Sequence, residues 1–247
     1  MWGDIAIAFM LAFIISFVVT PYTIKLAHKV GAIDYPKDER RINKKPMPRL
    51  GGLAVILGFV VSIVYLLIIM SVEGTINLFE PDMYYTKMIG FGFGIVILTT
   101  VCFIDDAKGV HPLVKLTAQT IAAVIMVYAG VKIDNLEIDF INNLPWRDAF
   151  YIILTIGWIV GITNAINLID GLDGLSTGIS IIASISLLII FALNGSPLIS
   201  IILITALAGS LIGFLPFNFN PAKTFIGDVG SNFLGFSLAV ISILRCC

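Results

Sequence analysis

The sequence predicts an all-α fold, a polytopic bundle of about eight transmembrane helices forming a single domain over residues 1–247, and three observations point to it. The chain is 58% hydrophobic and 13% charged, whereas soluble domains contain about 25% charged residues. Apolar runs recur along the whole chain, at lengths near the roughly 17 to 25 residues that cross a bilayer. Because the hydrocarbon core offers no water, each run must make its backbone hydrogen bonds internally, as a helix.

The apolar runs alternate with polar segments. In chain order the runs cover residues 5–24, 50–70, 88–104, 116–131, 150–166, 179–193, 198–215 and 233–244. Several runs are short, so we expect their helices to extend into the flanking polar residues. The third run ends at an acidic pair, the fifth ends in a segment rich in Asn, Asp and Gly, and the eighth is the shortest.

Basic residues are distributed unevenly among the connecting segments. One side of the bundle receives eleven of them: Lys25, Lys29, Lys37, Arg40, Arg41, Lys44, Lys45, Arg49, Lys108, Lys115 and Lys223. The connecting segments of the other side receive three, Lys87, Lys132 and Arg147, and are rich in acidic residues. The positive-inside rule therefore places the first, third, fifth and seventh connecting segments in the cytoplasm and the N-terminus outside.

Each of these four segments carries an unusual polar sequence. In chain order they contain NKKPMPRLGG (43–52), CFIDDAKGVHPLVKLTAQ (102–119), NAINLIDGLDGLSTG (164–178) and PFNFNPAKTFIGDVGS (216–231). In the third of them Asn164, Asn167, Asp170 and Asp173 recur at every third residue, and the glycines beside them favour a break in the helix. A broken helix end can bring side chains and backbone amides together on an anion or a metal. The alternative is that these residues are caps and turn formers where a helix enters water.

The acidic residues of these segments indicate metal-assisted chemistry on phosphates. Asp105 and Asp106 are adjacent at the end of the third run, where two carboxylates need solvation or a cation. Asp228 lies among glycines that let the backbone approach a phosphate closely. Carboxylate and amide oxygens suit Mg²⁺, which usually bridges to substrate phosphates. The two histidines are too scattered for a zinc site, and the sequence lacks a nucleotide-hydrolysing G-x-x-x-x-G-K-[ST] loop.

Two other functional classes fit the composition less well. A transporter would place its ionisable residues in the middle of spans, whereas the acidic residues here lie at span ends on one side. The net charge of −1 gives no indication of nucleic-acid binding. The residues alone therefore predict a membrane-embedded, Mg²⁺-assisted enzyme that works on phosphates at the cytoplasmic surface, where its acceptor could be a lipid.

The motifs NAINLIDGLDGL and FIGDVGSNFLGF, supported by FIDD and PRLGG, carry a family resemblance over about residues 20–240. In this order and spacing they resemble the polyprenyl-phosphate N-acetylhexosamine-1-phosphate transferases. The resemblance implies transfer of a sugar 1-phosphate from a UDP-sugar to undecaprenyl phosphate in a bacterial plasma membrane, with release of UMP. PMPRLGG is similar to the branch that uses UDP-N-acetylglucosamine and starts teichoic acid or other envelope polymers. The sister branch, which transfers phospho-N-acetylmuramoyl-pentapeptide, remains the alternative.

The resemblance also implies roles for individual residues. Asp105 and Asp106 match a pair that activates the lipid phosphate, and Asp228 and Asn167 match the Mg²⁺ ligands. The residues that match substrate-binding positions are Lys45, Lys115 (followed by Gln119), Asn164, Asp170, Asp173 and Asn218. Attack by the lipid phosphate and attack by an aspartate, giving a covalent intermediate, both remain open, and so does a homodimer.

Members of this family usually continue for roughly another hundred residues, with two or three further spans and a histidine-rich fifth cytoplasmic loop. We therefore expect residues 1–247 alone to have little or no transferase activity. An inactive membrane protein built on the same scaffold is the corresponding alternative.

Overall fold

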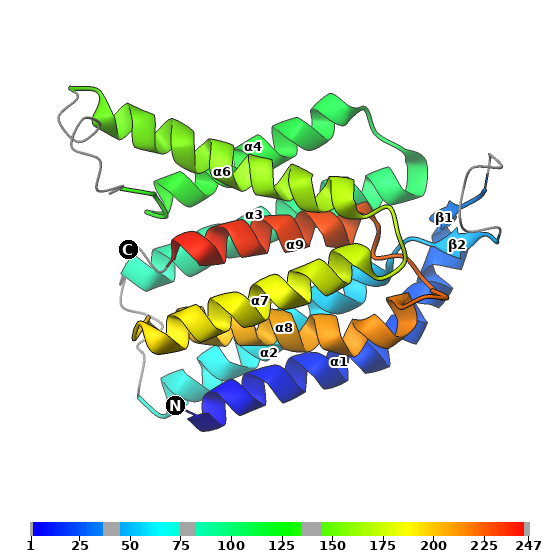
Figure 1. Ribbon diagram of the computed structural model, residues 1–247, viewed down its shortest axis with the longest axis horizontal. Coiled ribbons are helices and arrows are strands. Elements are labelled where there is room, and N and C mark those ends of the chain that lie inside the picture. The colour runs from blue at the N-terminus through cyan, green and yellow to red at the C-terminus, as the bar shows by residue number, and fades with distance from the viewer. Residues whose placement is uncertain (1, 37–44, 75–82, 135–144, 245–247) are drawn as a thin grey trace.

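The computed structural model describes residues 2–36, 45–74, 83–134 and 145–244, and it confirms an all-α bundle of parallel and antiparallel helices (Figure 1). Every expected span is a helix. In chain order the elements are α1 (Trp2–Val30), β1 (Ile33–Asp34), β2 (Met47–Pro48), α2 (Gly51–Val72), α3 (Met83–Lys108), α4 (Pro112–Tyr128), α6 (Arg147–Ile169), α7 (Leu175–Leu193), α8 (Leu198–Asn218) and α9 (Gly227–Ile243). Within the described residues, six helices are long and apolar enough to cross a membrane, and α4 and α9 are shorter apolar helices.

Most of the helices extend past the apolar runs, as expected from the lengths of those runs. The start of α3 is the clearest case, and it corrects the expected position of Lys87. Lys87 was expected in a connecting segment, but it lies inside α3, where its side chain is buried. The correction arises because α3 begins at Met83, ahead of the apolar run. Four of the basic residues used to orient the bundle, Lys37, Arg40, Arg41 and Lys44, lie outside the described residues.

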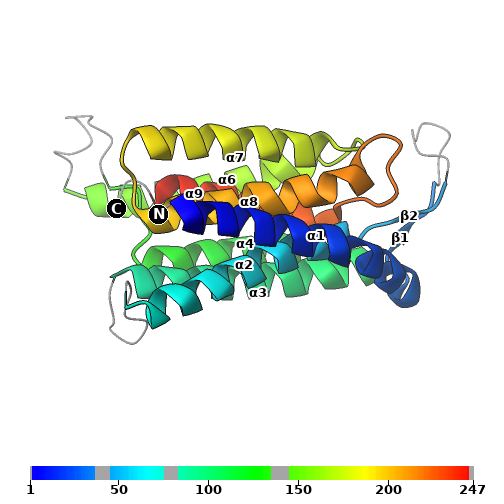
Figure 2. The same cartoon turned by 90° about the horizontal axis from the view of Figure 1, so that it is seen from below.

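Helices α8 and α9 form the centre of the bundle, and both are buried along most of their length. Figure 2 shows the other helices packed around them, with α1, α2 and α7 against α8 and with α3 and α6 against α9. Helices α1 and α8 approach closely because Gly209 and Gly213 lie against the carbonyl oxygens of Phe9 and Phe13. Small residues at such crossings let two membrane helices pack backbone to backbone.

The four polar segments meet at one end of the bundle, the right-hand end in Figure 1. The strands β1 and β2 pair antiparallel there, and the α3–α4, α6–α7 and α8–α9 connections lie beside them. Backbone hydrogen bonds join the α8–α9 connection to the end of β2 and to the start of α2. Phe225 N–H donates to the Pro48 carbonyl at 2.8 Å, and Gly52 N–H donates to the Ile226 carbonyl at 2.8 Å. The prediction that the motif segments share one face is thus confirmed, and which side of the membrane that face occupies stays a prediction.

Candidate active site

The helix break predicted between the asparagines and the second glycine is present. Helix α6 ends at Ile169, and Gly174 takes the left-handed conformation (φ +70°) directly before α7 begins. In the turn between them, Oδ1 of Asp170 accepts a hydrogen bond from the Ser176 hydroxyl at 2.6 Å. Burial of the Asp170 carboxyl raises its pKa to about 6, against the opposing effect of the Ser176 hydrogen bond.

A charged cluster of Asp105, Lys115, Asn167 and Asp228 forms where α3, α4, α6 and α9 meet. The Lys115 ammonium lies 2.8 Å from Oδ2 of Asp105 and 3.4 Å from Oδ2 of Asp228, so one cation joins two carboxylates that are far apart in the chain. The Val110 N–H donates to the other oxygen of Asp105 at 2.7 Å. In this arrangement the Asp228 side chain is 27% exposed, whereas that of Asp105 is 9% exposed and therefore largely buried.

Asn167 completes the charged cluster from the last turn of α6. Its Nδ2 donates to Oδ1 of Asp228 at 2.6 Å and to the Ser231 hydroxyl at 2.8 Å, and neither bond uses its amide oxygen. The two expected Mg²⁺ ligands, Asn167 and Asp228, are therefore in direct contact, and their role toward a metal stays a prediction. The sequence reasoning did not single out Ser231, although it stands three residues after Asp228 in the GDVGS motif, which places both on one face of α9.

Asp106, unlike the adjacent Asp105, makes its hydrogen bonds to the backbone of α9. Its two carboxylate oxygens accept hydrogen bonds from the N–H groups of Asp228 and Val229, at 3.1 and 3.0 Å. These N–H groups begin α9 and have no partner within the helix, so Asp106 caps α9 from outside it. The cap also occupies the backbone donors that could otherwise have bound an anion at this helix end.

Two expected substrate-binding residues fasten the α8–α9 connection. Asn218 is buried, its Oδ1 accepts from the Thr177 hydroxyl at 2.7 Å, and its Nδ2 donates to the Thr224 carbonyl at 3.0 Å. Oδ2 of Asp173 accepts from the Ala222 N–H at 3.0 Å and from Nδ2 of Asn220 at 3.1 Å. The structure thus gives both side chains a local structural role, and their roles toward a substrate stay predictions.

The other two expected substrate-binding residues lie away from the charged cluster. Asn164 is one turn deeper on α6 and bonds to Gln119 on α4. Lys45 is exposed in the turn before β2, at the same end of the bundle but with no described contact to the charged cluster.

The charged cluster fits a magnesium ion by the chemistry of its donors. No group of three or more His, Cys, Asp and Glu side chains poised for a metal occurs in the described part of the chain. Mg²⁺ does not need such a cage, because it usually binds one or two carboxylates and completes its octahedron with waters and substrate phosphates. Asp228, the amide oxygen of Asn167 and Asp105 are oxygen donors of that kind.

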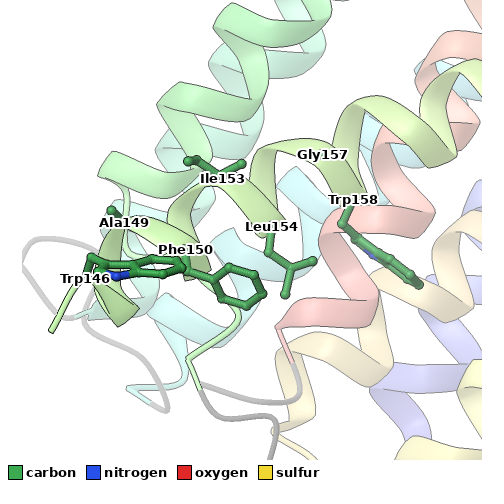
Figure 3. Close-up of a pocket in the computed structure, with 7 residues that line it drawn as sticks. All are labelled: Trp146, Ala149, Phe150, Ile153, Leu154, Gly157 and Trp158. Atoms are coloured by element: carbon green, nitrogen blue, oxygen red, sulfur yellow. The ribbon is translucent and has the colours of Figure 1, made fainter. Parts of the chain in front are cut away.

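A groove of about 510 Å³ lies elsewhere on the surface, along one side of α6 (Figure 3). It is lined by Trp146, Ala149, Phe150, Ile153, Leu154, Gly157 and Trp158. Trp146 stands at the start of α6, at the opposite end of that helix from Asn167. The lining of this groove is aromatic and aliphatic apart from the backbone and the indole nitrogens, and it contains none of the site's polar groups.

The model of glycosyl transferase family 4 matches residues 88–245, a stretch that contains every member of the charged cluster. The chain belongs to this family.

Several members of glycosyl transferase family 4 are similar to the chain over nearly its whole length. A Bacillus subtilis protein named "Probable undecaprenyl-phosphate N-acetylglucosaminyl 1-phosphate transferase" is 36% identical over 97% of this chain and 63% of its own length. The Mycobacterium tuberculosis decaprenyl-phosphate N-acetylglucosaminephosphotransferase is 33% identical, over 97% and 60%. The phospho-N-acetylmuramoyl-pentapeptide-transferase of Staphylococcus epidermidis is 34% identical, over 95% and 74%. The chain thus spans somewhat less than two thirds of the first two relatives.

Proposed function

We propose that this family 4 chain carries the catalytic face of an integral membrane phosphotransferase. In the proposed reaction, a phosphate oxygen of undecaprenyl phosphate bonds to the β-phosphorus of a UDP-N-acetylhexosamine. The bond from that phosphorus to the bridging oxygen breaks, and UMP leaves with the electron pair. The lipid-linked product would begin a cell-envelope polymer such as teichoic acid.

The contact of Lys115 with both Asp105 and Asp228 is the observation that carries this proposal. Both reactants are anions, so a site for their reaction must offset their repulsion and the charge that develops on UMP. The Lys115 ammonium supplies one fixed positive charge where α3, α4 and α9 meet, and this charge offsets one of the two carboxylates beside it. Mg²⁺, when bound by Asp228 and Asn167, would supply the remaining positive charge to the diphosphate.

Asp105 is the carboxylate best placed to handle the proton or to attack. It is held by Lys115 and by the Val110 N–H, and, unlike Asp106, neither of its oxygens caps α9. Asp106 has both oxygens committed to α9, so we assign it to holding Asp228 in place. The two adjacent aspartates, which the sequence does not distinguish, are thus assigned different roles.

The relatives divide between two sugar nucleotides. The Bacillus and Mycobacterium relatives have names that specify N-acetylglucosamine, and the Staphylococcus relative has a name that specifies the muramoyl-pentapeptide. We propose UDP-N-acetylglucosamine, because the PMPRLGG segment is fastened directly to the loop that ends in Asp228 and this segment is the one that resembles the N-acetylglucosamine branch.

The test uses a chimera in which residues 1–247 replace the aligned part of the Bacillus subtilis relative, with the remainder of that relative following. Membranes containing it are given undecaprenyl phosphate, Mg²⁺ and one UDP-sugar, and UMP is quantified. We expect UMP from UDP-N-acetylglucosamine and none above background from UDP-N-acetylmuramoyl-pentapeptide. The reverse preference would assign the chain to the muramoyl branch, and no UMP from either, with the relative itself active, would refute the transferase proposal.

A further inference from the structure

Beneath the charged cluster lies a second layer of polar side chains, which we call the amide triad: Gln119, Asn164 and Asn232. Each comes from a helix that also supplies the charged cluster. Gln119 follows Lys115 by four residues on α4, Asn164 precedes Asn167 by three on α6, and Asn232 follows Asp228 by four on α9. Since residues three or four apart share a helix face, each member lies about 4.5–6 Å farther along its helix, below its partner.

Hydrogen bonds link the members of the amide triad, with Gln119 in the middle. Gln119 Nε2 donates to Oδ1 of Asn232 at 2.7 Å, and Asn164 Nδ2 donates to Oε1 of Gln119 at 2.6 Å. A longer bond of 3.4 Å runs back from Gln119 Nε2 to Oδ1 of Asn164. Gln119 is 3% exposed and Asn232 is 0% exposed, whereas Asn164 is partly exposed, so Gln119 and Asn232 are too deeply buried to reach a substrate.

The amide triad is also joined to the backbone of the helices that it connects. Asn232 Nδ2 donates to the Asp228 carbonyl at 2.9 Å, and Asn164 Nδ2 donates to the Val160 carbonyl at 2.9 Å. An amide left without a partner at this depth is costly, because lipid and apolar side chains offer no replacement. A rotation or a slide of α4 would break the Gln119 bonds, and it would carry Lys115 away from both carboxylates at the same time.

We propose that Gln119, Asn164 and Asn232 are positioning residues. Their hydrogen-bonded amides, bridged by Gln119, fix the rotation of α4 against α6 and α9 and so hold the Lys115 ammonium between Asp105 and Asp228. This inference deepens the proposed function, on which its catalytic consequence rests. The structural part of the proposal concerns the position of Lys115, which can be tested without measuring enzyme turnover.

The Gln119–Asn164 pair, which joins α4 to α6, allows two single variants and a double variant that compensates for them. Gln119→Asn shortens the bridge by one methylene and Asn164→Gln lengthens it by one. The double variant therefore restores the length of the α4–α6 bridge, while the side chain at 119 stays one methylene shorter toward Asn232. Ser62→Ala is the matched control, because the buried Ser62 hydroxyl also joins two helices, donating to the Ala8 carbonyl at 2.8 Å, far from the charged cluster. Asn232→Ser serves as a third probe if either single variant fails to fold.

The readout is the rate at which acetic anhydride acylates Lys115 in membranes, relative to exposed Lys108, measured by peptide mass spectrometry below the unfolding midpoint. An amine in an ion pair reacts slowly, because acylation needs the neutral, accessible form. We expect each single variant to raise the Lys115 rate about tenfold, the factor for the loss of roughly 1.4 kcal/mol of interaction. The double swap should return it toward the wild-type rate, and Ser62→Ala should not change it.

A parallel measurement in the chimera separates the two proposals. The single variants should lower kcat for UMP release with little change in KM for the UDP-sugar, and the swap should restore kcat. A lower thermal midpoint with an unchanged Lys115 rate would overturn the positioning role and leave the triad a packing feature. An altered Lys115 rate in a chimera that releases no UMP even as wild type would uphold the positioning role and refute the proposed function.

Discussion

Asp105 and Asp106 are adjacent in the chain, yet their carboxylates serve different partners. Asp105 pairs with Lys115, and Asp106 accepts the first two free N–H groups of α9. Charge-assisted hydrogen bonds to a helix N-terminus are among the stronger polar contacts in proteins. In the proposed mechanism Asp105 is therefore the group that takes part in the chemistry, and Asp106 is the group that stabilises the start of α9.

Substitution should separate these two roles. Asp106→Ala removes both acceptors and should lower the free energy of unfolding by about 1–2 kcal/mol, as the loss of a helix cap does. Asp105→Asn keeps an oxygen for the Val110 N–H and leaves the Lys115 ammonium beside Asp228, so it should destabilise the protein less than Asp106→Ala does, while it abolishes UMP release in the chimera. Thermal midpoints in detergent and UMP release measure the two effects, and equal destabilisation by both substitutions would contradict the division of roles.

Asp170 gives the α6–α7 turn a dependence on pH. Its pKa is raised from 3.8 to about 6 in the folded protein, mainly by burial, so the native state holds a proton that the unfolded state releases. This contribution to stability is fully present below pH 3.8 and is lost as the pH rises through 6. Asp170→Asn should therefore gain stability relative to wild type as the pH rises from 5 to 7.5. Thermal midpoints across that range measure the difference, and a constant difference would remove Asp170 as its cause.

At the scale of elements, the start of α9 depends on one glycine. Gly227 has φ +72°, and a Cβ at this position would collide with the Arg49 carbonyl oxygen. Gly178 in α7 has nothing within 4 Å of such a Cβ. The first glycine is thus required by the close approach of the α8–α9 connection to the segment after β2, and the second is not.

Alanine at the two glycines should have opposite effects. Gly227→Ala should destabilise the protein by more than about 1–2 kcal/mol, because the left-handed backbone cost adds to the collision. Gly178→Ala should be neutral or stabilising by up to about 1 kcal/mol, the helix preference of alanine over glycine. Thermal unfolding of both variants in detergent is the measurement. A well-tolerated Gly227→Ala would show that the α8–α9 connection is not held in the described position.

The helices were predictable because apolar length and the absence of water leave a membrane segment little choice. The break before α7 was also predictable, from glycines beside a run of polar residues. The partners of the polar residues were not. Nothing in the local sequence distinguishes Asp106, whose N–H donors lie 122 and 123 residues away on α9, from Asp105. Ser231 and Asn232 gained their importance from contacts with α4 and α6 that a single sequence does not reveal.

At the scale of the whole molecule, the bundle brings four distant polar segments to one end. We predict that this end faces the cytoplasm, from the eleven-to-three distribution of basic residues in the sequence. A variant without its native cysteines, given Lys45→Cys or Asp148→Cys, tests the orientation. In intact cells, a membrane-impermeant maleimide should label the cysteine at 148, where the aspartate side chain is 74% exposed, and not the one at 45. Labelling of position 45 alone would invert the orientation.

The convergence of α3, α4, α6 and α9 on Asp228 is the centre of the functional proposal, and the Mg²⁺ dependence of UMP release by the chimera tests it most directly. Asp228→Asn is compared with wild type and with Asp148→Asn, an exposed carboxylate near the start of α6. We expect Asp228→Asn to lower the rate by about 10²–10³-fold or more, as the loss of one transition-state contact does, and to raise the Mg²⁺ concentration needed. Its thermal midpoint should stay near that of wild type, and Asp148→Asn should match wild type in both measurements. Near-normal UMP release by Asp228→Asn at limiting Mg²⁺ would contradict the assignment of Asp228 to the metal and the charged cluster to catalysis.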